Sequence, residues 1–342
     1  MFRPMNKISL IGIGWILLLA ACTTTSRISS LNLDVMVPAK IPISPQNHKI
    51  AAVYRNLRQV RPPEIQQPNP DGTPENTDSI ASWHYFRTFC QTLEEIGYFD
   101  TICQIVLKPV PGDSMELPPL TPADWQEIRN VLPDAGVVLS FDFFITEGRT
   151  SYWKEFNIFN KEVLTTAVWQ IILPDSVNYL YQKTDTTWWE GEAFTQLEVR
   201  KKLPPPQTAI LEGAAEAGRA FAQKLAPHWE TVERVLYLSG NYELQAATKL
   251  AQNNEWLQAA EIWKRHIASP NKSIAAKCTF NLALASEMAG NFEAALDWAI
   301  RSYYIFNEQN PEHAARCKAY IRILSQRKAE VNQLDSQLGR VN

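Results

Sequence analysis

The sequence lacks the short motifs by which common catalytic and cofactor-binding sites are recognised. It contains no GxSxG nucleophile turn, no HExxH zinc helix, no Walker phosphate loop and no dinucleotide-binding glycine fingerprint. Its five histidines are isolated, and no two stand at the spacing of metal ligands. We therefore expect no catalytic residue, no metal ligand and no cofactor, and a protein that is not an enzyme. The histidines are His48, His84, His228, His266 and His313.

An excess of positive charge is also missing. The chain has 33 Lys and Arg against 36 Asp and Glu, a net charge of −3. Proteins that bind nucleic acid need a basic surface to displace the counterions of the phosphate backbone. No polybasic segment that would bind lipid head groups is present either. We therefore expect no nucleic-acid partner.

The first 22 residues have the parts of a secretory signal. Arg3 and Lys7 precede an apolar run at 8–19, which is too short for a comfortable membrane span. The run closes on Leu-Ala-Ala-Cys at 19–22, which resembles the lipobox of bacterial lipoproteins. The resemblance implies that Cys22 becomes the first residue of the mature protein and carries acyl chains that anchor it permanently. The alternatives are an ordinary signal peptide with an unrelated cysteine, or an uncleaved anchor.

The other four cysteines are not spaced as CxxC, which argues against thioredoxin chemistry and zinc ribbons. An exported chain meets an oxidising compartment, so disulfides can form. The pairs that stay within one domain are Cys90 with Cys103 and Cys278 with Cys317. Each cysteine has apolar neighbours in the sequence, so buried free thiols are the alternative.

The pattern of apolar residues divides the chain into four parts. Residues 1–21 form the signal peptide, and 22–30 are a short polar tether. Strand patterns mix with helical patterns over 31–226, whereas only a helical period is found over 227–342. We therefore expect a mixed α/β domain followed by an all-α domain, in the α+β class overall.

Within the first domain, residues 49–55 are a nearly continuous apolar run, typical of a strand that is covered on both faces. Thr121 and Pro122 begin a helix, as N-cap and first-turn residue, with Asp124 near the positive end of the helix dipole. Turns are expected at 160–161 and 174–175. The pattern predicts strands at 31–37, 49–55, 102–107, 136–145, 152–159, 163–173 and 177–187, helices at 80–98, 121–132 and 208–225, and a surface loop at 58–79.

The second domain contains an internal repeat. Two stretches superimpose when Ala259 is laid on Ala295, at an offset close to the 34 residues of a tetratricopeptide unit. Gly290 stands where that repeat has its turn glycine, and Asn254 replaces the glycine in the first unit. The stretch resembles two adjacent tetratricopeptide units, and a polar helix at 312–338 would cap them.

The whole layout resembles an uncharacterised family of Bacteroidota-type lipoproteins with an N-terminal α/β domain and a tetratricopeptide-like tail. The α/β part is also similar in its order of elements to the N-terminal domains of the periplasmic assembly proteins TolB and CsgG. Neither resemblance implies a catalytic residue. The stretches that carry the family resemblance are Ile50–Asn56, Trp188–Gly191, Gly240–Tyr242, and Trp256 with Ala259 and Trp263.

The residues after the cysteine indicate the side of the membrane. In lipoproteins that this sequence resembles, acidic residues directly after the cysteine act as a signal for display on the cell surface. The run 23–27 has no acid, and it lacks the Asp that retains some lipoproteins at the inner membrane. We therefore expect an anchor in the outer membrane that faces the periplasm.

The resemblance to tetratricopeptide units places five polar residues on the concave side of the helical domain. They are Gln245, Thr248, Lys277, Asn281 and Glu287. The amide of Asn281 could clamp the backbone of an extended peptide with two hydrogen bonds. The alternative is a short helical cap that only stabilises the fold.

A second candidate is the pair Trp188–Trp189. Adjacent residues on a strand point to opposite faces, so one ring is expected in the core and the other at the surface. An exposed Trp beside acids can stack on a sugar or on a partner's side chain, although packing under the Pro-rich segment would also explain it. Asp142 and Glu147 are five apart and so on opposite faces, which argues against a glycosidase pair and predicts a solvent-facing Asp142.

The sequence thus predicts a non-catalytic lipoprotein that binds an envelope protein or an extended peptide. The alternative is an envelope protein that binds or acts on glycans through the Trp188–Trp189 hairpin.

Overall fold

The computed structural model describes residues 28–44, 46–55, 77–107, 117–173, 178–193, 195–238 and 242–340. The expected signal peptide, Cys22, the turn at 174–175 and most of the loop at 58–79 lie outside these ranges.

The chain divides into two compact units. The first, here called the sheet unit, comprises Asn32–Val232 and Ser325–Asn342. The second, the helical unit, comprises Met1–Leu31 and Glu233–Leu324. The boundary between the units at 232–233 therefore falls six residues after the predicted boundary at 226–227. The last residues, Ser325–Asn342, belong to the sheet unit and not to the helical unit.

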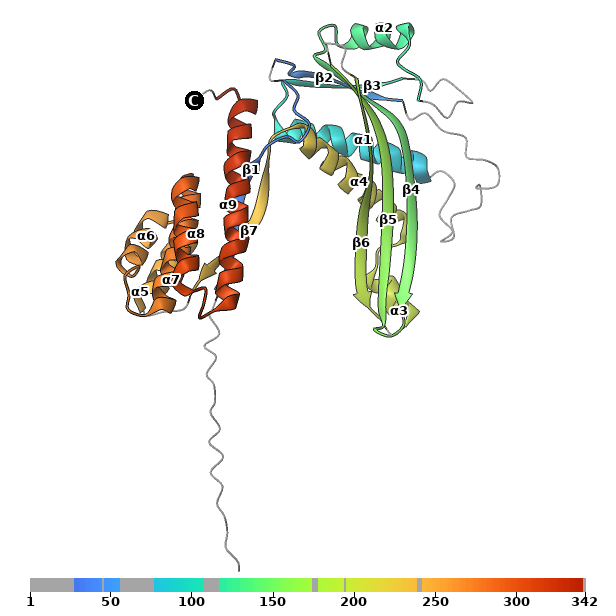
Figure 1. The fold of residues 1–342 in the computed structure, drawn as a ribbon. Coiled ribbons are helices and arrows are strands. Elements are labelled where there is room, and N and C mark those ends of the chain that lie inside the picture. The colour runs from blue at the N-terminus through green and yellow to red at the C-terminus, as the bar shows by residue number, and fades with distance from the viewer. Residues whose placement is uncertain are drawn as a thin grey trace, which may run out of the picture. The chain divides into compact units, whose positions relative to one another are not determined.

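The sheet unit is built on one five-stranded sheet with the order β3-β2-β4-β5-β6. β2 runs parallel to both β3 and β4, whereas β4, β5 and β6 form an antiparallel meander. Figure 1 shows the three long meander strands side by side. The strands are β2 (Lys49–Tyr54), β3 (Thr101–Val106), β4 (Val137–Trp153), β5 (Ile158–Ile172) and β6 (Asn178–Glu192).

Helices cover both faces of the parallel part of the sheet. α1 and α4 pack on one face, and α2 packs on the other. Ile50 and Ala52 of β2 point to the first face, while Ala51 and Val53 point to the second, and all four are fully buried. The prediction of a strand covered on both faces is confirmed. The helices of this unit are α1 (Thr77–Ile96), α2 (Pro122–Val131), α3 (Gln196–Lys202) and α4 (Pro206–Leu225).

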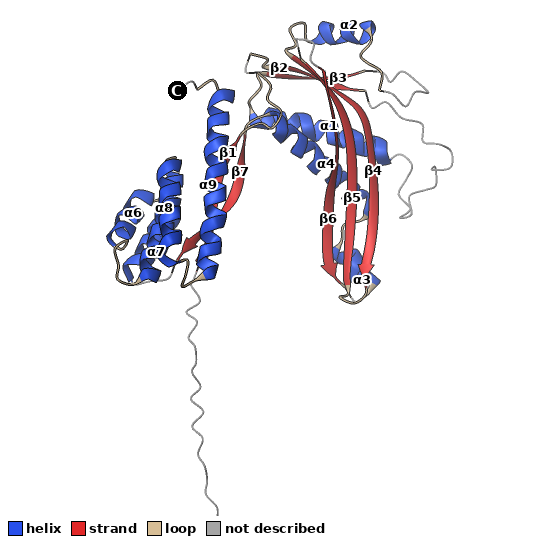
Figure 2. Cartoon of the chain, viewed as in Figure 1, coloured by secondary structure: helices blue, strands red, loops and turns tan. Residues whose placement is uncertain are grey.

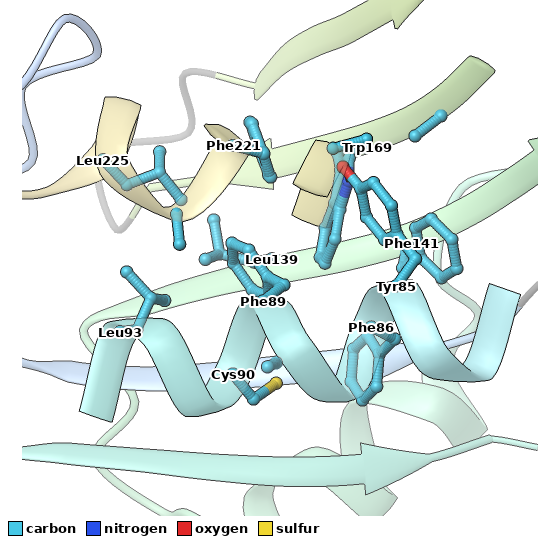
Figure 3. Close-up of a cluster of buried hydrophobic side chains, with 14 of the residues drawn as sticks. Tyr85, Phe86, Phe89, Cys90, Leu93, Leu139, Phe141, Trp169, Phe221 and Leu225 are labelled. Atoms are coloured by element: carbon cyan, nitrogen blue, oxygen red, sulfur yellow. The ribbon is translucent and has the colours of Figure 1, made fainter. Parts of the chain in front are cut away.

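Trp169 of β5 lies at the centre of the larger core. Its ring centroid is 4.5 Å from that of Phe89, 4.9 Å from that of Phe141 and 5.0 Å from that of Phe221. Its Nε1 donates a hydrogen bond of 3.2 Å to the hydroxyl of Tyr85, so its one polar atom is satisfied. Figure 3 shows these rings between α1, α4 and the sheet.

A glycine allows α1 and α4 to approach closely. A Cβ atom at Gly218 of α4 would lie 2.5 Å from the carbonyl oxygen of Tyr85 and 3.3 Å from the amide nitrogen of Phe89. Both atoms belong to the backbone of α1 and cannot move aside cheaply. The absence of a side chain at Gly218 therefore allows α1 and α4 to pack at the short distance at which their aromatic side chains meet in the core.

The start of α2 follows the prediction, because Thr121 caps it. The Thr121 side chain accepts a bond from the amide of Asp124, whose carboxylate accepts one from the Thr121 amide. The predicted turn at 160–161 is wrong. Asn160 and Lys161 lie inside β5, opposite Ser151 and Thr150.

The turn between β4 and β5 lies instead at 154–157. Asn157 adopts a left-handed conformation there with φ of 53°. Asn accepts this conformation more readily than most residues, which explains why the chain reverses at this point.

From Tyr242 to Gln337 the regular elements are helices, as predicted. Asn254 and Gly290, which the internal repeat aligns, follow α5 and α7 and are both left-handed, with φ of 66° and 72°. Asn254 therefore adopts the left-handed conformation that Gly290 adopts at the aligned position. The helices are α5 (Tyr242–Gln252), α6 (Trp256–Arg265), α7 (Lys272–Met288), α8 (Phe292–Phe306) and α9 (Pro311–Gln337), drawn in blue in Figure 2.

One element of the predicted helical domain, 227–342, was predicted wrongly. Strand patterns were expected to end before residue 227, but β7 (His228–Tyr237) is a strand and pairs with β1 (Ile28–Val37). The pairing partner β1 is distant in the sequence, and β7 buries the charged side chain of Arg234, a residue type that sequence patterns assign to the surface. None of the helices described is long and apolar enough to span a membrane.

Candidate functional site

The predicted peptide groove of the helical unit contains a segment of the chain itself. Asn281 of α7 is buried, and its Oδ1 accepts a hydrogen bond of 3.0 Å from the amide of Tyr237. Its Nδ2 donates another of 3.0 Å to the carbonyl oxygen of the same residue. Asn281 therefore makes the two-bond backbone clamp that the sequence predicted, but it holds the end of β7.

A buried ion pair holds β7 three residues earlier. The Arg234 guanidinium donates from Nε to both carboxylate oxygens of Glu287, at 3.2 and 3.1 Å, and from Nη2 at 2.9 Å. The Tyr320 hydroxyl of α9 donates to the same carboxylate at 2.6 Å. Burial, followed by the charge of Glu287, raises the pKa of Tyr320 well above its usual value, so this hydroxyl keeps its proton. Three charge-assisted bonds and a phenol thus satisfy the buried carboxylate.

The five predicted partner-binding residues do not form one exposed surface. Asn281 and Glu287 bind β7 as described, and Thr248 is also buried, with its hydroxyl donating to the carbonyl of Leu244 at 3.0 Å. Lys277 is half-buried, with its amine 6.0 Å from the ring centroid of Tyr237. Only Gln245 is fully exposed. Two of the five residues predicted to bind a partner, Asn281 and Glu287, therefore bind a strand of the chain itself.

A second polar chain extends from the same strand. The Tyr237 hydroxyl lies 2.8 Å from Nδ1 of His313, and His313 Nε2 lies 3.1 Å from the Ser302 hydroxyl and 3.3 Å from the Cys317 sulfur. Burial raises the pKa of Cys317 to about 11 and lowers the pKa of His313. At neutral pH the pair is therefore a neutral thiol beside a neutral imidazole. A cysteine nucleophile needs the thiolate, and burial disfavours the thiolate of Cys317.

The cysteines of the described chain carry no disulfide. Cys90 is on α1 and packs in the core between this helix and the sheet, whereas Cys103 of β3 packs against the core on the opposite face of the sheet. The sheet separates these two thiols, which rules out the first of the two pairings. Burial raises the pKa of Cys278 to about 12, as expected for an unreactive thiol.

Asp142 is buried, so the prediction that it faces solvent is wrong. It sits where the register of β4 shifts between Phe141 and Phe143, and this bulge turns its side chain inward. Its Oδ1 lies 3.0 Å from Nε of the equally buried Arg55 and accepts a bond of 2.6 Å from Ser140. Desolvation nevertheless raises its pKa. Glu147 is exposed and pairs with Arg149 at 3.0 Å, so the two acids do not form a catalytic pair.

The Trp188–Trp189 pair is divided between the two faces of the sheet, as predicted. Trp189 packs against the core under α4, whereas Trp188 is 62% exposed on the other face. On that face Trp188 stands opposite Glu162 of β5, which stands opposite Arg149 of β4. Trp153, at the end of β4, is 53% exposed and has the same orientation.

We call this surface the open sheet face. It comprises the side chains of β4, β5 and β6 that point away from α1 and α4. Its residues around Trp188 are Glu147, Arg149, Trp153, Glu162, Thr186, Glu190 and Glu192. Four acids stand there against one base, which gives a net charge of −3 on these residues. Among the described residues, no group of three or more His, Cys, Asp or Glu side chains could hold a metal ion.

Comparison with protein families places this sheet in a known group. The model of a domain of unknown function, DUF8603, matches residues 48–237, which is more than half of the chain. The chain belongs to the DUF8603 family. A second domain of unknown function, DUF6340, matches residues 245–326. The DUF8603 match thus ends at Tyr237, the residue that Asn281 clamps, and the DUF6340 match covers most of the helices that hold it.

Solved structures give only remote likenesses to this DUF8603 protein. Rare lipoprotein B from Shewanella oneidensis is 11% identical, with a TM-score of 0.24, over 51% of this chain and 94% of its own. A minor lipoprotein from Acinetobacter baumannii is 10% identical, with a TM-score of 0.24, over 53% and 96% of the two chains. A protein from Helicobacter pylori described as a neuraminyllactose-binding hemagglutinin homolog is 9% identical, with a TM-score of 0.26, over 55% and 89%. No curated protein sequence matches the chain.

Proposed function

We propose that this DUF8603 protein is a non-catalytic lipoprotein of the bacterial outer membrane that faces the periplasm and binds a partner protein. The Leu-Ala-Ala-Cys sequence at 19–22 supports the lipid anchor, and the absence of acids at 23–27 supports the periplasmic side. The buried groups Arg234, Glu287, Arg55 and Asp142 are paired internally, and burial keeps the thiols of Cys278 and Cys317 neutral. This supports a binding role over a catalytic one.

Exposure of Trp188 is the observation that carries the binding proposal. A Trp this exposed, on a face to which the described helices α1 and α4 contribute nothing, gains free energy when a partner covers it. The surrounding acids favour a partner that presents basic side chains, because opposite charges speed association and exclude wrong partners. In this proposal the tetratricopeptide-like helices α5 to α8 hold β7 and do not bind the partner, because Asn281 and Glu287 of α7 already bind that strand.

A glycan is the second candidate. Trp188 and Trp153 are flat aromatic surfaces beside Glu162, Glu190 and the exposed pair Glu147–Arg149, and such groups could stack on and hydrogen-bond to sugar rings. Uncharged sugars do not need the net negative charge of this face, however. The charge therefore favours a protein.

The anchor is tested by changing Cys22 to Ser. The variant is expected to stay uncleaved or to appear in the soluble fraction, because no thiol remains to take the diacylglyceryl group. Detergent partitioning and intact mass measure this, and protease added to intact cells should leave the wild-type chain uncut. A Ser variant that partitions with the mature wild-type mass contradicts the anchor, and rapid cleavage on intact cells contradicts the periplasmic side.

The binding face is tested by placing a photo-crosslinking amino acid at Thr186, next to Trp188 on the open sheet face. We expect one envelope protein to be captured in cells, and its yield to fall at least about ten-fold in Trp188→Ala and Glu190→Lys variants. Tyr179→Ala is the matched control, because Tyr179 is exposed on β6 but points to the other face. Binding of the purified partner should weaken with salt.

Two outcomes would contradict this assignment. Crosslinks that survive both variants would exclude the open sheet face. Retention of the chain on purified envelope glycan, lost in Trp188→Ala and indifferent to salt, would establish the glycan candidate instead.

A further inference from the structure

Two lysine amines lie close together beside the edge strand β6, on the face opposite to the open sheet face, and the charge of a third lysine acts on one of them. Lys183 is on β6, Lys224 is in the last turn of α4, and Lys40 follows β1. Lys224 Nζ donates a hydrogen bond of 2.6 Å to the Tyr181 hydroxyl and lies within hydrogen-bonding reach of the Lys183 amine. The Lys40 amide donates at 2.9 Å to the Lys224 carbonyl, which fixes Lys40 at this helix end. We call these three residues the lysine cluster.

The lysine cluster is not neutralised by its described neighbours. The charged groups that act on Lys224 are Lys183, Lys40 and Asp185, and Asp185 already forms an ion pair with Lys183. Three ammonium groups and one carboxylate leave a net charge of +2. The negative end of the α4 dipole favours a cation at Lys224 but supplies only about half a charge.

The strain of this arrangement is seen at Lys224. Burial, followed by the neighbouring Lys183, lowers its pKa to about 8. A nearby like charge disfavours the ammonium form, whereas a bound anion would favour it, and groups with perturbed pKa values cluster at functional sites.

Tyr181 adds a neutral donor. Its ring stacks on Phe221 with a centroid distance of 4.5 Å, so its position is fixed by the core. Burial raises its pKa, so it stays protonated at neutral pH. Its oxygen accepts from Lys224, and none of the hydrogen bonds described uses its own hydrogen, which leaves it as a donor.

We propose that the lysine cluster and the Tyr181 hydroxyl form a binding site for a phosphomonoester group. Such a group carries a charge of about −1.5 to −2 at pH 7 and has three acceptor oxygens, which complements a net charge of +2 and four donor groups, the three lysine amines and the Tyr181 hydroxyl. The Lys183 side chain is 39% exposed, so the group can reach the amines from solvent. A soluble phosphate ester and a lipid phosphate head group share this chemistry.

The first test uses the purified full-length chain with isotopically methylated lysines, followed by NMR. Without ligand, the Lys224 amine should titrate at about 8. Saturating inorganic phosphate should raise this pKa toward the usual lysine value of about 10.4, because a bound anion favours the ammonium form. An equal concentration of chloride should not. A Lys224 titration that phosphate leaves unchanged would overturn the proposal without any variant.

The second test locates the site by substitution. Lys183→Met and Tyr181→Phe should each weaken binding of short-chain phosphatidic acid by roughly ten-fold to a hundred-fold, the usual worth of a hydrogen bond to a charged group. Lys49→Met is the matched control, since Lys49 pairs with Asp134 far along the sheet. Tyr181→Phe keeps the stack on Phe221, so it separates lost binding from lost folding.

The same titrations distinguish the source of the group. Phosphatidic acid that binds at least about ten-fold tighter than inorganic phosphate indicates a lipid head group, and equal affinities indicate a soluble ester. Both results support the site. Equal weakening by Lys49→Met, or equal binding of phosphatidylcholine with the same short chains, would show general charge or acyl-chain attraction only and would overturn it.

Discussion

Replacing Trp169 with Ala should lower the free energy of unfolding of the sheet unit by about 3–5 kcal/mol, the usual range for a fully buried Trp. The loss combines transfer of the indole to water with a cavity bounded by Phe89, Phe141 and Phe221. The Tyr85 hydroxyl would also lose its donor, and a buried polar group without a partner costs about 1–3 kcal/mol more. Because whole domains are stable by only about 5–15 kcal/mol, the variant should be near its unfolding threshold.

Hydrogen exchange of the α1 and β5 amides in low urea would measure this change within the sheet unit. Trp188→Ala is the matched control, since the same residue type on the same sheet is 62% exposed there. It should change stability by less than about 0.5 kcal/mol. Similar losses in both variants would show that the aromatic cluster does not carry the stability of this unit.

The elements that the sequence predicted well are those with local causes. Thr121 caps α2 through bonds to a residue three positions away, and the two-faced apolar run of β2 reads directly as a covered strand. The division of Trp188 from Trp189 follows from the alternation of a strand alone. Each of these depends only on neighbours in the chain.

The elements that it missed depend on distant partners. Arg234 is buried because Glu287, 53 residues later, neutralises it, and no local pattern contains that information. β7 is a strand where a helix was expected, because it pairs with β1 near the other end of the sequence. Asp142 is buried for a similar reason, through a bulge in β4 and the distant Arg55.

The sequence predicted how Asn281 binds a peptide backbone, but not which segment it binds. Asn281 was expected to clamp an extended backbone, and it does so with two bonds of 3.0 Å to Tyr237. A repeat pattern shows which side chains line a groove, but it does not show that the chain supplies its own strand to fill it. In the sequence, only the pair Trp188–Trp189 indicates the open sheet face. Its acidic residues are on three different strands, so they become neighbours only when β4, β5 and β6 pair.

Changing Glu287 to Ala should lower the free energy of unfolding of the helical unit by about 3–5 kcal/mol, the usual cost of removing one partner of a buried ion pair. The Arg234 guanidinium would stay buried, with its Nη1 bond to the Glu233 carbonyl at 3.1 Å but without its counter-ion. The Tyr320 hydroxyl would lose its acceptor as well. If β7 is released, hydrogen exchange of the Tyr237 amide should become faster, because its bond to Asn281 protects this amide in the wild type.

The double variant Arg234→Met, Glu287→Met is the matched control. Well-packed apolar side chains in place of a buried pair are often neutral or stabilising, because neither charge then has to leave water. The double variant should therefore be more stable than Glu287→Ala by at least about 2 kcal/mol and should keep the Tyr237 amide protected. Urea unfolding followed by α-helical circular dichroism would measure the first quantity, and hydrogen exchange the second. If the single and double variants lose the same stability, the pair does not hold β7 by charge neutralisation, and the strand depends on the Asn281 clamp and its apolar contacts.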